Sequence, residues 1–176
     1  MAFLKSLLIV LLYFFLNFSV AYSKDSIAFI DLDLILKNSN YGKSLLNQFD
    51  IDNEKNVKEL KVKESELKKI EDQIKKKKNI ISREELEKEL VILKDKITEF
   101  NKTKDQLLSK FENKRNKEIN EFFLKINPII QNYMNENSID ILLERKNVFI
   151  GKNDSDITKV IIQQINNSLK WNDKIE

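Results

Sequence analysis

The side chains best suited to chemistry in this sequence are two close pairs of carboxylates, Glu84 with Glu85 and Asp154 with Asp156. Paired acids can divide the roles of general acid and general base. Each pair, however, stands where a helix is predicted to begin, and carboxylates there cap the helix and complement its dipole. The chain has no cysteine and no histidine, which excludes disulfides, thiolate or imidazole metal ligands and Ser-His pairs. We therefore predict no enzyme activity and no catalytic, metal-binding or cofactor-binding residues.

A second group of charged side chains is the run of four lysines Lys75, Lys76, Lys77 and Lys78. A nucleic-acid site would combine such a run with stacking aromatic residues, but the nearest aromatics, Phe49 and Phe100, are many helical turns away. Nucleic acid is therefore not an expected partner. Successive helix residues are rotated by ~100°, so the four lysines surround a helix, which is tolerable only where a partner helix has stopped. Two interpretations stay open for this helix end: it keeps the molecule soluble, or its charge steers a partner chain or a membrane surface.

The composition favours long solvated helices over one thick core. Charged residues make up 34% of the 176 residues, above the roughly 25% of an average globular domain. The apolar fraction is 41%, and Lys+Arg 31 against Asp+Glu 28 gives a net charge of only +3. The net charge by itself demands no acidic partner.

Residues 1–23 are predicted to be a signal peptide. Lys5 precedes an apolar run, and Ala21-Tyr22-Ser23 places small residues at the two positions that a signal peptidase reads. The mature chain would then begin near Lys24. The alternative is an uncleaved membrane anchor, because residues 6–23 carry no charge and ~20 apolar residues span a bilayer. In both cases the rest of the chain leaves the cytoplasm.

The middle of the chain, residues 45–127, is predicted to be a long helical arm. It lies between Gly42 and Pro128, and the only other glycine or proline is Gly151. In its second half one seam repeats at spacings of four and three, which is typical of a coiled coil: Leu86, Leu90, Leu93, Ile97, Phe100, Lys104, Leu107 and Phe111. Past Lys114 the seam shifts register, which indicates a new packing partner. In the first half the corresponding frame contains three polar residues, Asn53, Asn56 and Lys63, which predicts a loose and wet middle.

Two adjacent seams predict an antiparallel hairpin with its tip near residues 75–84. The first helix should end near Lys78, with Asn79 as a left-handed cap. Ser82 and Glu85 form a capping box, so the second helix should start at Arg83. At ~1.5 Å per residue, arms of roughly 35 to 45 residues would be about 50 to 65 Å long.

The two ends of the chain, residues 24–44 and 128–170, are predicted to form a β-rich body, followed by a tail at 171–176. A strand begins at Ser26 and a short helix covers 32–37. After one further helical turn beyond Pro128, strands at 139–143 and 148–150 are expected to pair as a hairpin. Asp156 should open a final helix with one apolar face, Ile157, Val160, Ile161 and Leu169. These pieces bury too little to stand alone and leave edge strands, so we expect oligomerisation through Ile27, Phe29, Ile139, Ile141, Leu143, Val148 and Ile150.

These features together resemble the Skp (OmpH) family of periplasmic chaperones. The resemblance rests on the leader, the strand IAFIDLD, the helix entry SNYGKSLLNQF with Ser39, Gly42 and Lys43, the charged hairpin, and the tail IDILLERKNVFIGKNDSDITKVIIQQIN. It implies a mostly α-helical α+β fold in which a small β body holds three chains together as a homotrimer. It also implies that the helical arms enclose unfolded outer-membrane proteins without any nucleotide-driven cycle.

The predicted function is that of an ATP-independent holdase. Isolated apolar side chains outside the main seam are candidates for contacts with an unfolded client, since many weak contacts in an enclosed volume add up: Val57, Val62, Val91, Ile92 and Leu108. The alternative for each is that it merely flanks the coiled-coil seam. The alternative for the whole protein is a membrane-anchored coiled-coil spacer of the cell envelope.

Overall fold

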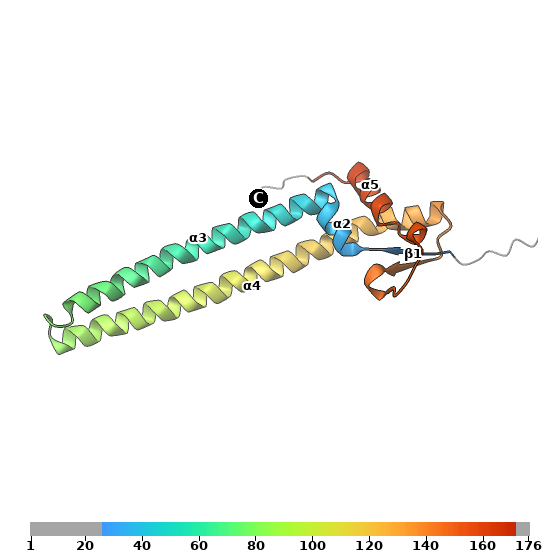
Figure 1. Cartoon of the computed structure of the whole chain (residues 1–176). Coiled ribbons are helices and arrows are strands. Elements are labelled where there is room, and N and C mark those ends of the chain that lie inside the picture. Colours follow the sequence, from blue (N-terminus) through green and yellow to red (C-terminus); the bar gives the residue numbers. More distant parts are fainter. Residues whose placement is uncertain (1–25, 172–176) are drawn as a thin grey trace, which may run out of the picture.

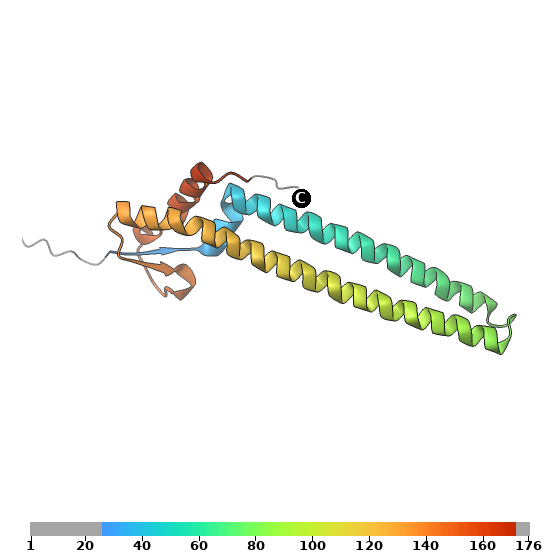
Figure 2. The same ribbon diagram turned by 180° about the vertical axis from the view of Figure 1, so that it is seen from behind.

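The computed structural model describes residues 26–171 of the chain. The predicted signal peptide and residues 172–176 of the predicted tail lie outside the described residues. The dominant feature is an arm of two antiparallel helices, α3 (Asn40–Lys77) and α4 (Arg83–Glu136), which lie side by side in both views (Figures 1 and 2). Between residues 26 and 171 no helix is both long enough and apolar enough to cross a membrane.

The remaining elements gather at the end of the arm opposite its tip (Figure 1). They are β1 (Ile27–Ile30), α2 (Leu32–Asn38), β2 (Ile141–Glu144), two short 3-10 helices, η1 (Arg145–Asn147) and η2 (Asn153–Ser155), and α5 (Thr158–Ser168). We call this part the body. The predicted fold, a mostly helical α+β protein with a long hairpin and a small β part, is confirmed.

The sheet differs from the predicted one. β1 pairs in parallel with β2, with Ile27 opposite Ile141, and a single bridge joins the other edge of β1 to Asp156. The predicted hairpin between 139–143 and 148–150 is wrong, because the connecting residues form η1 and residues 148–150 are not a strand. A run such as Val-Phe-Ile fits a strand by composition, but strand preference depends on a neighbouring strand. Here residues 148–150 pair with neither β1 nor β2, so the run lacks such a neighbour.

The turn from β1 into the arm depends on two caps and one glycine. The Asp31 carboxylate accepts a hydrogen bond from the Leu34 N–H, and the buried Ser39 hydroxyl accepts one from the Gly42 N–H at 3.1 Å. A Cβ atom on Gly42 would lie 1.9 Å from the Leu36 carbonyl oxygen. Glycine is therefore required here because α2 and α3 approach each other too closely for any side chain.

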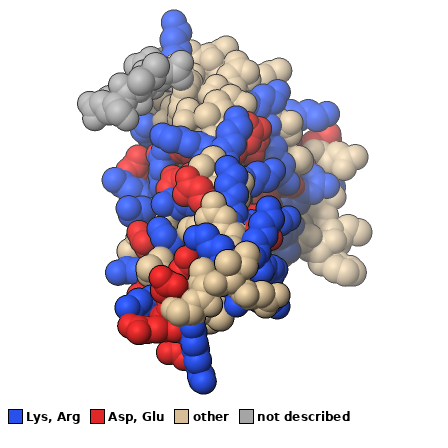
Figure 3. All heavy atoms as spheres, turned by 90° about the vertical axis from the view of Figure 1, so that its left-hand side faces the viewer, with Lys and Arg blue, Asp and Glu red and all other residues tan. Residues whose placement is uncertain are grey.

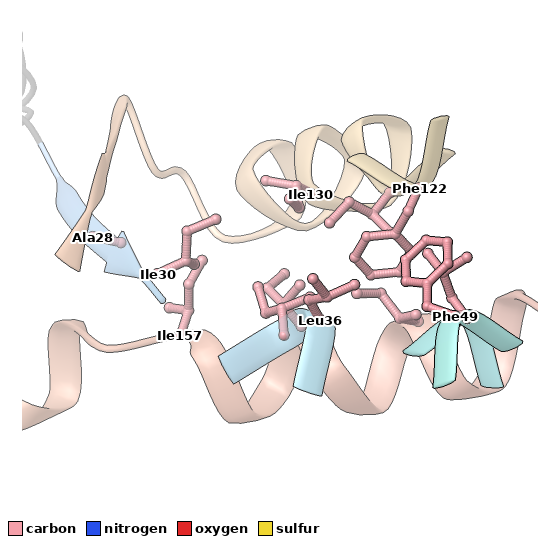
Figure 4. Packing of buried hydrophobic residues seen from close by; sticks show 12 residues of the cluster. Ala28, Ile30, Leu36, Phe49, Phe122, Ile130 and Ile157 are labelled. Carbon is pink, nitrogen blue, oxygen red and sulfur yellow. The ribbon is translucent and has the colours of Figure 1, made fainter. Parts of the chain in front are cut away.

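The body and the base of the arm share one hydrophobic core. Its fully buried members come from α2, α3, α4 and α5: Ile35, Leu45, Phe122, Ile126, Ile161 and Ile165. In Figure 4, Phe49 and Phe122 approach each other from α3 and α4, and Ile30 meets Ile157. Trp171 packs edge-on against Tyr41, with ring centroids 4.8 Å apart. The first residue of the predicted tail is therefore part of the packed structure.

Two helix ends were predicted imprecisely. Asn79 is not left-handed, since Ser138 is the one non-glycine residue with positive φ among residues 26–171. Instead, the Lys77 carbonyl accepts hydrogen bonds from the N–H groups of Ile80 and Ile81. α4 runs through Pro128 as far as Glu136, beyond the expected single turn. The capping box of Ser82 and Glu85, in contrast, is confirmed.

The final helix begins close to the predicted place. The Asp156 carboxylate accepts hydrogen bonds from both the N–H and the hydroxyl of Thr158. Ile157 and Ile161 are buried as predicted, but Val160 is exposed and Ile165 completes the buried face. The spacing of 157, 161 and 165 follows the four-residue repeat of one helix face.

Candidate interaction surfaces

The arm is held together across its length by a sparsely buried seam. From residue 50 to residue 121 the one buried side chain is Ile74, near the tip. Leu86, Leu93, Phe100 and Leu107 are half-buried between the helices. Leu90 and Ile97, which were predicted in the same seam, are 47% and 43% exposed. α4 is thus turned so that one side of the predicted seam opens to solvent.

Two ion pairs join α3 to α4 among the described residues. Near the body, the Asp52 carboxylate lies 2.6 Å from the Lys114 ammonium, and near the tip the Glu89 carboxylate lies 3.1 Å from that of Lys77. Burial by itself raises the pKa of Asp52, but hydrogen bonds from Lys114 and Gln48 outweigh it and leave that pKa below its ordinary value. The hydrogen bond to Asp52 correspondingly raises the pKa of Lys114. An ion pair therefore links α3 to α4 at two points along the seam, one near each end of the arm.

Between these two ion pairs the helices leave two clefts. The one nearer the body has a volume of about 130 Å³ and is lined by Asn53, Asn56, Val57, Leu60, Lys104, Leu107, Leu108 and Phe111. The one nearer the tip has a volume of about 180 Å³ and is lined by Lys63, Glu66, Leu67, Ile70, Lys96, Glu99, Phe100 and Thr103. Both lie where polar residues interrupt the α3 seam, which agrees with the predicted loose middle. We call them the inner cleft and the outer cleft.

The four lysines lie at the tip, where the sequence placed them. Lys75 pairs with Glu71 one turn earlier on α3 at 2.8 Å, and Lys77 pairs with Glu89 of α4. Lys76 and Lys78 form no ion pair with any described residue. Figure 3 looks at this end of the molecule and shows basic side chains intermixed with acidic and uncharged ones. Ile80 is 84% exposed in the turn, so the tip has an apolar side chain that the sequence reasoning did not select.

All five apolar residues predicted to contact a client are on the surface. Their exposed fractions lie between 41% for Val57 and 60% for Val62. The inner cleft brings Val57 and Leu108 together from the two helices, and a shallow depression on α4 near the tip includes Val91 and Ile92. Val62 borders none of the described clefts. Val57 and Leu108 flank the coiled-coil seam and also remain accessible, so their position is compatible with both alternatives, a role in the seam and contact with a client.

The residues predicted for oligomerisation fall into two groups. Phe29 is buried beneath the Arg145 guanidinium, and Ile139 and Val148 are half-buried. Four others are exposed on the body: Ile27, Ile141, Leu143 and Ile150. The sequence reasoning missed Phe149, which is fully exposed, because it was assigned to a strand that does not form. The available signal was a phenylalanine two residues before Gly151, the one glycine in the second half of the chain.

Three of the four paired carboxylates have structural roles, and the fourth, Asp154, is exposed in η2. Glu85 completes the capping box, and Glu84 pairs with Lys88 at 2.8 Å. The Asp156 carboxylate is bound by Thr158 and Arg145. Burial alone raises the pKa of Asp156, but these hydrogen bonds and the Arg145 charge keep it below its ordinary value. Among residues 26–171 no three acidic side chains are grouped as metal ligands would be.

Comparison with known proteins places this architecture in a family. No curated protein matches the chain by sequence. A crystal structure of a candidate outer membrane chaperone (OmpH-like) from Caulobacter crescentus CB15 superimposes with a TM-score of 0.76 at 17% identity, covering 84% of this chain and 87% of that one. The family model described as outer membrane protein (OmpH-like) matches residues 26–165, which include both strands, the whole arm and most of α5. The chain belongs to the OmpH-like family of outer membrane proteins.

Proposed function

We propose that the protein is an ATP-independent periplasmic holdase that keeps unfolded outer-membrane proteins soluble between helical arms. The observation that carries the proposal is the arm, where half-exposed apolar side chains are scattered over a rod with nearly balanced charge. An unfolded chain can make many weak contacts with such a surface without being fixed in one conformation. The similarity to a candidate outer membrane chaperone supports the same function.

A homotrimer is the assembly that we propose for the working molecule. The two segments predicted for oligomerisation, residues 24–44 and 128–170, would hold the three chains, and the segment between them, residues 45–127, would enclose the client. The support is that five apolar side chains of the body are exposed, and exposed apolar surface of this extent favours an interface: Ile27, Ile141, Leu143, Phe149 and Ile150. β2 also carries one edge that no described strand covers, and open edges favour pairing with another chain.

Native mass measurement tests the assembly. The mature protein is expected at three times the mass of its chain, and Phe149→Ser is expected to weaken the trimer because it removes the most exposed apolar side chain of the body. Val62→Ser is the matched control, since it removes an exposed apolar side chain from the arm. A wild-type monomer would exclude the trimer.

Suppression of aggregation tests the function. The wild-type protein is expected to keep an unfolded β-barrel membrane protein soluble without ATP, at about one oligomer per client. Absence of any suppression would exclude the holdase. We also propose that residues 1–23 are removed on export to the periplasm. N-terminal sequencing of the native protein checks this, and an intact leader in the membrane fraction would favour the envelope spacer.

A further inference from the structure

The inner cleft differs in chemistry from the outer cleft beside it. Four of the eight residues lining the outer cleft are charged, namely Lys63, Glu66, Lys96 and Glu99. Of the eight residues lining the inner cleft only Lys104 is charged, and five are leucine, valine or phenylalanine. The two lysines and two glutamates of the outer cleft balance each other's charge and favour water there. The inner cleft, in contrast, favours an apolar group.

The inner cleft has room for one large side chain. Its volume is about 130 Å³, and for comparison an apolar cavity of roughly 150 Å³ in another protein binds benzene. It is open to solvent on one side, where Val57 and Leu108 are both about half exposed. An extended chain lying along the arm could therefore insert a side chain without separating α3 from α4.

Polar groups border this cleft and are available to a second chain. The amides of Asn53 and Asn56 make no side-chain hydrogen bond with any residue from 26 to 171. An amide side chain has both donors and an acceptor, as a peptide backbone has. The Lys104 ammonium likewise forms no ion pair with a described residue. Its charge is therefore available to an acidic side chain of a second chain.

We propose that the inner cleft is a subsite for one large apolar side chain of an unfolded polypeptide. The amides of Asn53 and Asn56 bind the neighbouring peptide backbone, and Lys104 favours an acidic residue next to the inserted side chain. The proposal rests on the holdase function and deepens it. It places one defined contact inside the arm, in addition to diffuse contacts over its surface.

The test uses short unstructured peptides labelled for fluorescence anisotropy. One peptide has a single phenylalanine flanked by aspartates, and the other has serine in place of the phenylalanine. The phenylalanine peptide is expected to bind about tenfold more tightly, because the half-open cleft removes only part of the ring from water. Equal affinity of the two peptides would overturn the proposal.

The decisive variant is Asn56→Leu, which fills the cleft with an apolar side chain at a seam position and is expected to preserve the helices. It should weaken binding of the phenylalanine peptide about tenfold, while Val62→Leu, on the same helix but outside the clefts, should leave it unchanged. Circular dichroism verifies that both variants are folded. Unchanged binding by Asn56→Leu would also overturn the proposal.

Failure of the subsite and failure of the holdase are distinguishable. If the wild-type protein suppresses aggregation but the two peptides bind alike, the subsite is wrong and the holdase stands. If the wild-type protein fails to suppress aggregation, the holdase is wrong. Phenylalanine-dependent binding lost in Asn56→Leu would then still support the cleft as a peptide site.

Discussion

The body and the arm belong to one chain but follow opposite rules of packing. In the body and at the arm's base, side chains such as Ile35, Ile126 and Ile161 are completely buried. Over the 72 positions from 50 to 121, Ile74 alone is buried. The difference teaches that burial is divided unevenly along the molecule: the body and the arm's base hold the buried core, and the arm keeps apolar side chains accessible.

The largest expected effect is on the joint between the two regions. Gly42→Ala places a Cβ atom against the Leu36 carbonyl oxygen, so α2 and α3 must move apart. We expect a loss of more than about 4 kcal/mol of unfolding free energy, measured by urea denaturation. Trp171, the single tryptophan of the chain, packs on Tyr41 and provides the fluorescence signal. Lys43→Ala is the control at an exposed neighbouring position, and equal stability of the two variants would contradict the close approach.

A pair of isoleucine truncations tests the comparison directly. Ile126→Ala in the core should destabilise by about 2 to 5 kcal/mol, as large-to-small core substitutions do. Ile97→Ala in the arm should cost less than about 1 kcal/mol, because its side chain is already 43% exposed. Urea denaturation measures both. Similar losses at the two sites would show that the arm is packed as tightly as the body.

The charges at the tip should affect rates more than stability. Replacing Lys75, Lys76, Lys77 and Lys78 by glutamine is expected to slow capture of an unfolded client several-fold at low salt, with little change at high salt, because exposed charges are screened. Stopped-flow fluorescence measures the rate, and native mass measurement verifies an unchanged oligomer. If the rate does not change at low salt, the run serves solubility alone.

The smallest expected effect concerns the ion pair between Asp52 and Lys114. The pKa of Asp52 is lowered in the folded state, so its contribution to stability is present above the unfolded pKa of roughly 3.9 and is lost as the pH falls through the folded value. We expect less than about 1 kcal/mol, since the pair is partly solvated. The protection factors of the arm's amides, which correct for the intrinsic pH dependence of amide exchange, should fall on acidification in the wild type but change less in Asp52→Asn. An equal fall in both would assign the effect to other groups.

Much of the architecture could be predicted because its signals are local. The capping box at Ser82, the lysine run and the entry at Ser39 to Gly42 each depend on residues within a few positions of one another. The strand pairing could not be predicted in this way. β2 pairs with β1 from the opposite end of the chain, and nothing near Val148 indicates that residues 148–150 pair with neither strand. Phe149 was missed for the same reason.

The rotation of α4 about its axis is a second feature that the apolar spacing of the sequence does not predict. The spacing of four and three identifies Leu90 and Ile97 as seam positions, but it does not say which side of the seam faces the partner. That choice depends on which residues of α3 lie opposite, which the pattern of α4 alone does not give. The polar residues of α3 predicted a loose middle, but the residues of α4 that complete the inner cleft, Lys104, Leu107, Leu108 and Phe111, became known only from the structure.

The parallel pairing of β1 with β2 has a consequence for the order in which the chain folds. Ile27 meets Ile141 across more than a hundred residues, and joining the ends of so long a flexible segment is entropically unfavourable and slow. Contacts in the helical hairpin begin at the tip, where Lys77 and Glu89 are 12 residues apart, and each contact formed there shortens the loop that the next one must close. Once the hairpin closes, it carries residues 40 and 136 to the same end of the rod. A chain that emerges from a translocation channel N-terminus first would therefore complete its arm before its sheet, and the arm would serve as the template on which the body closes.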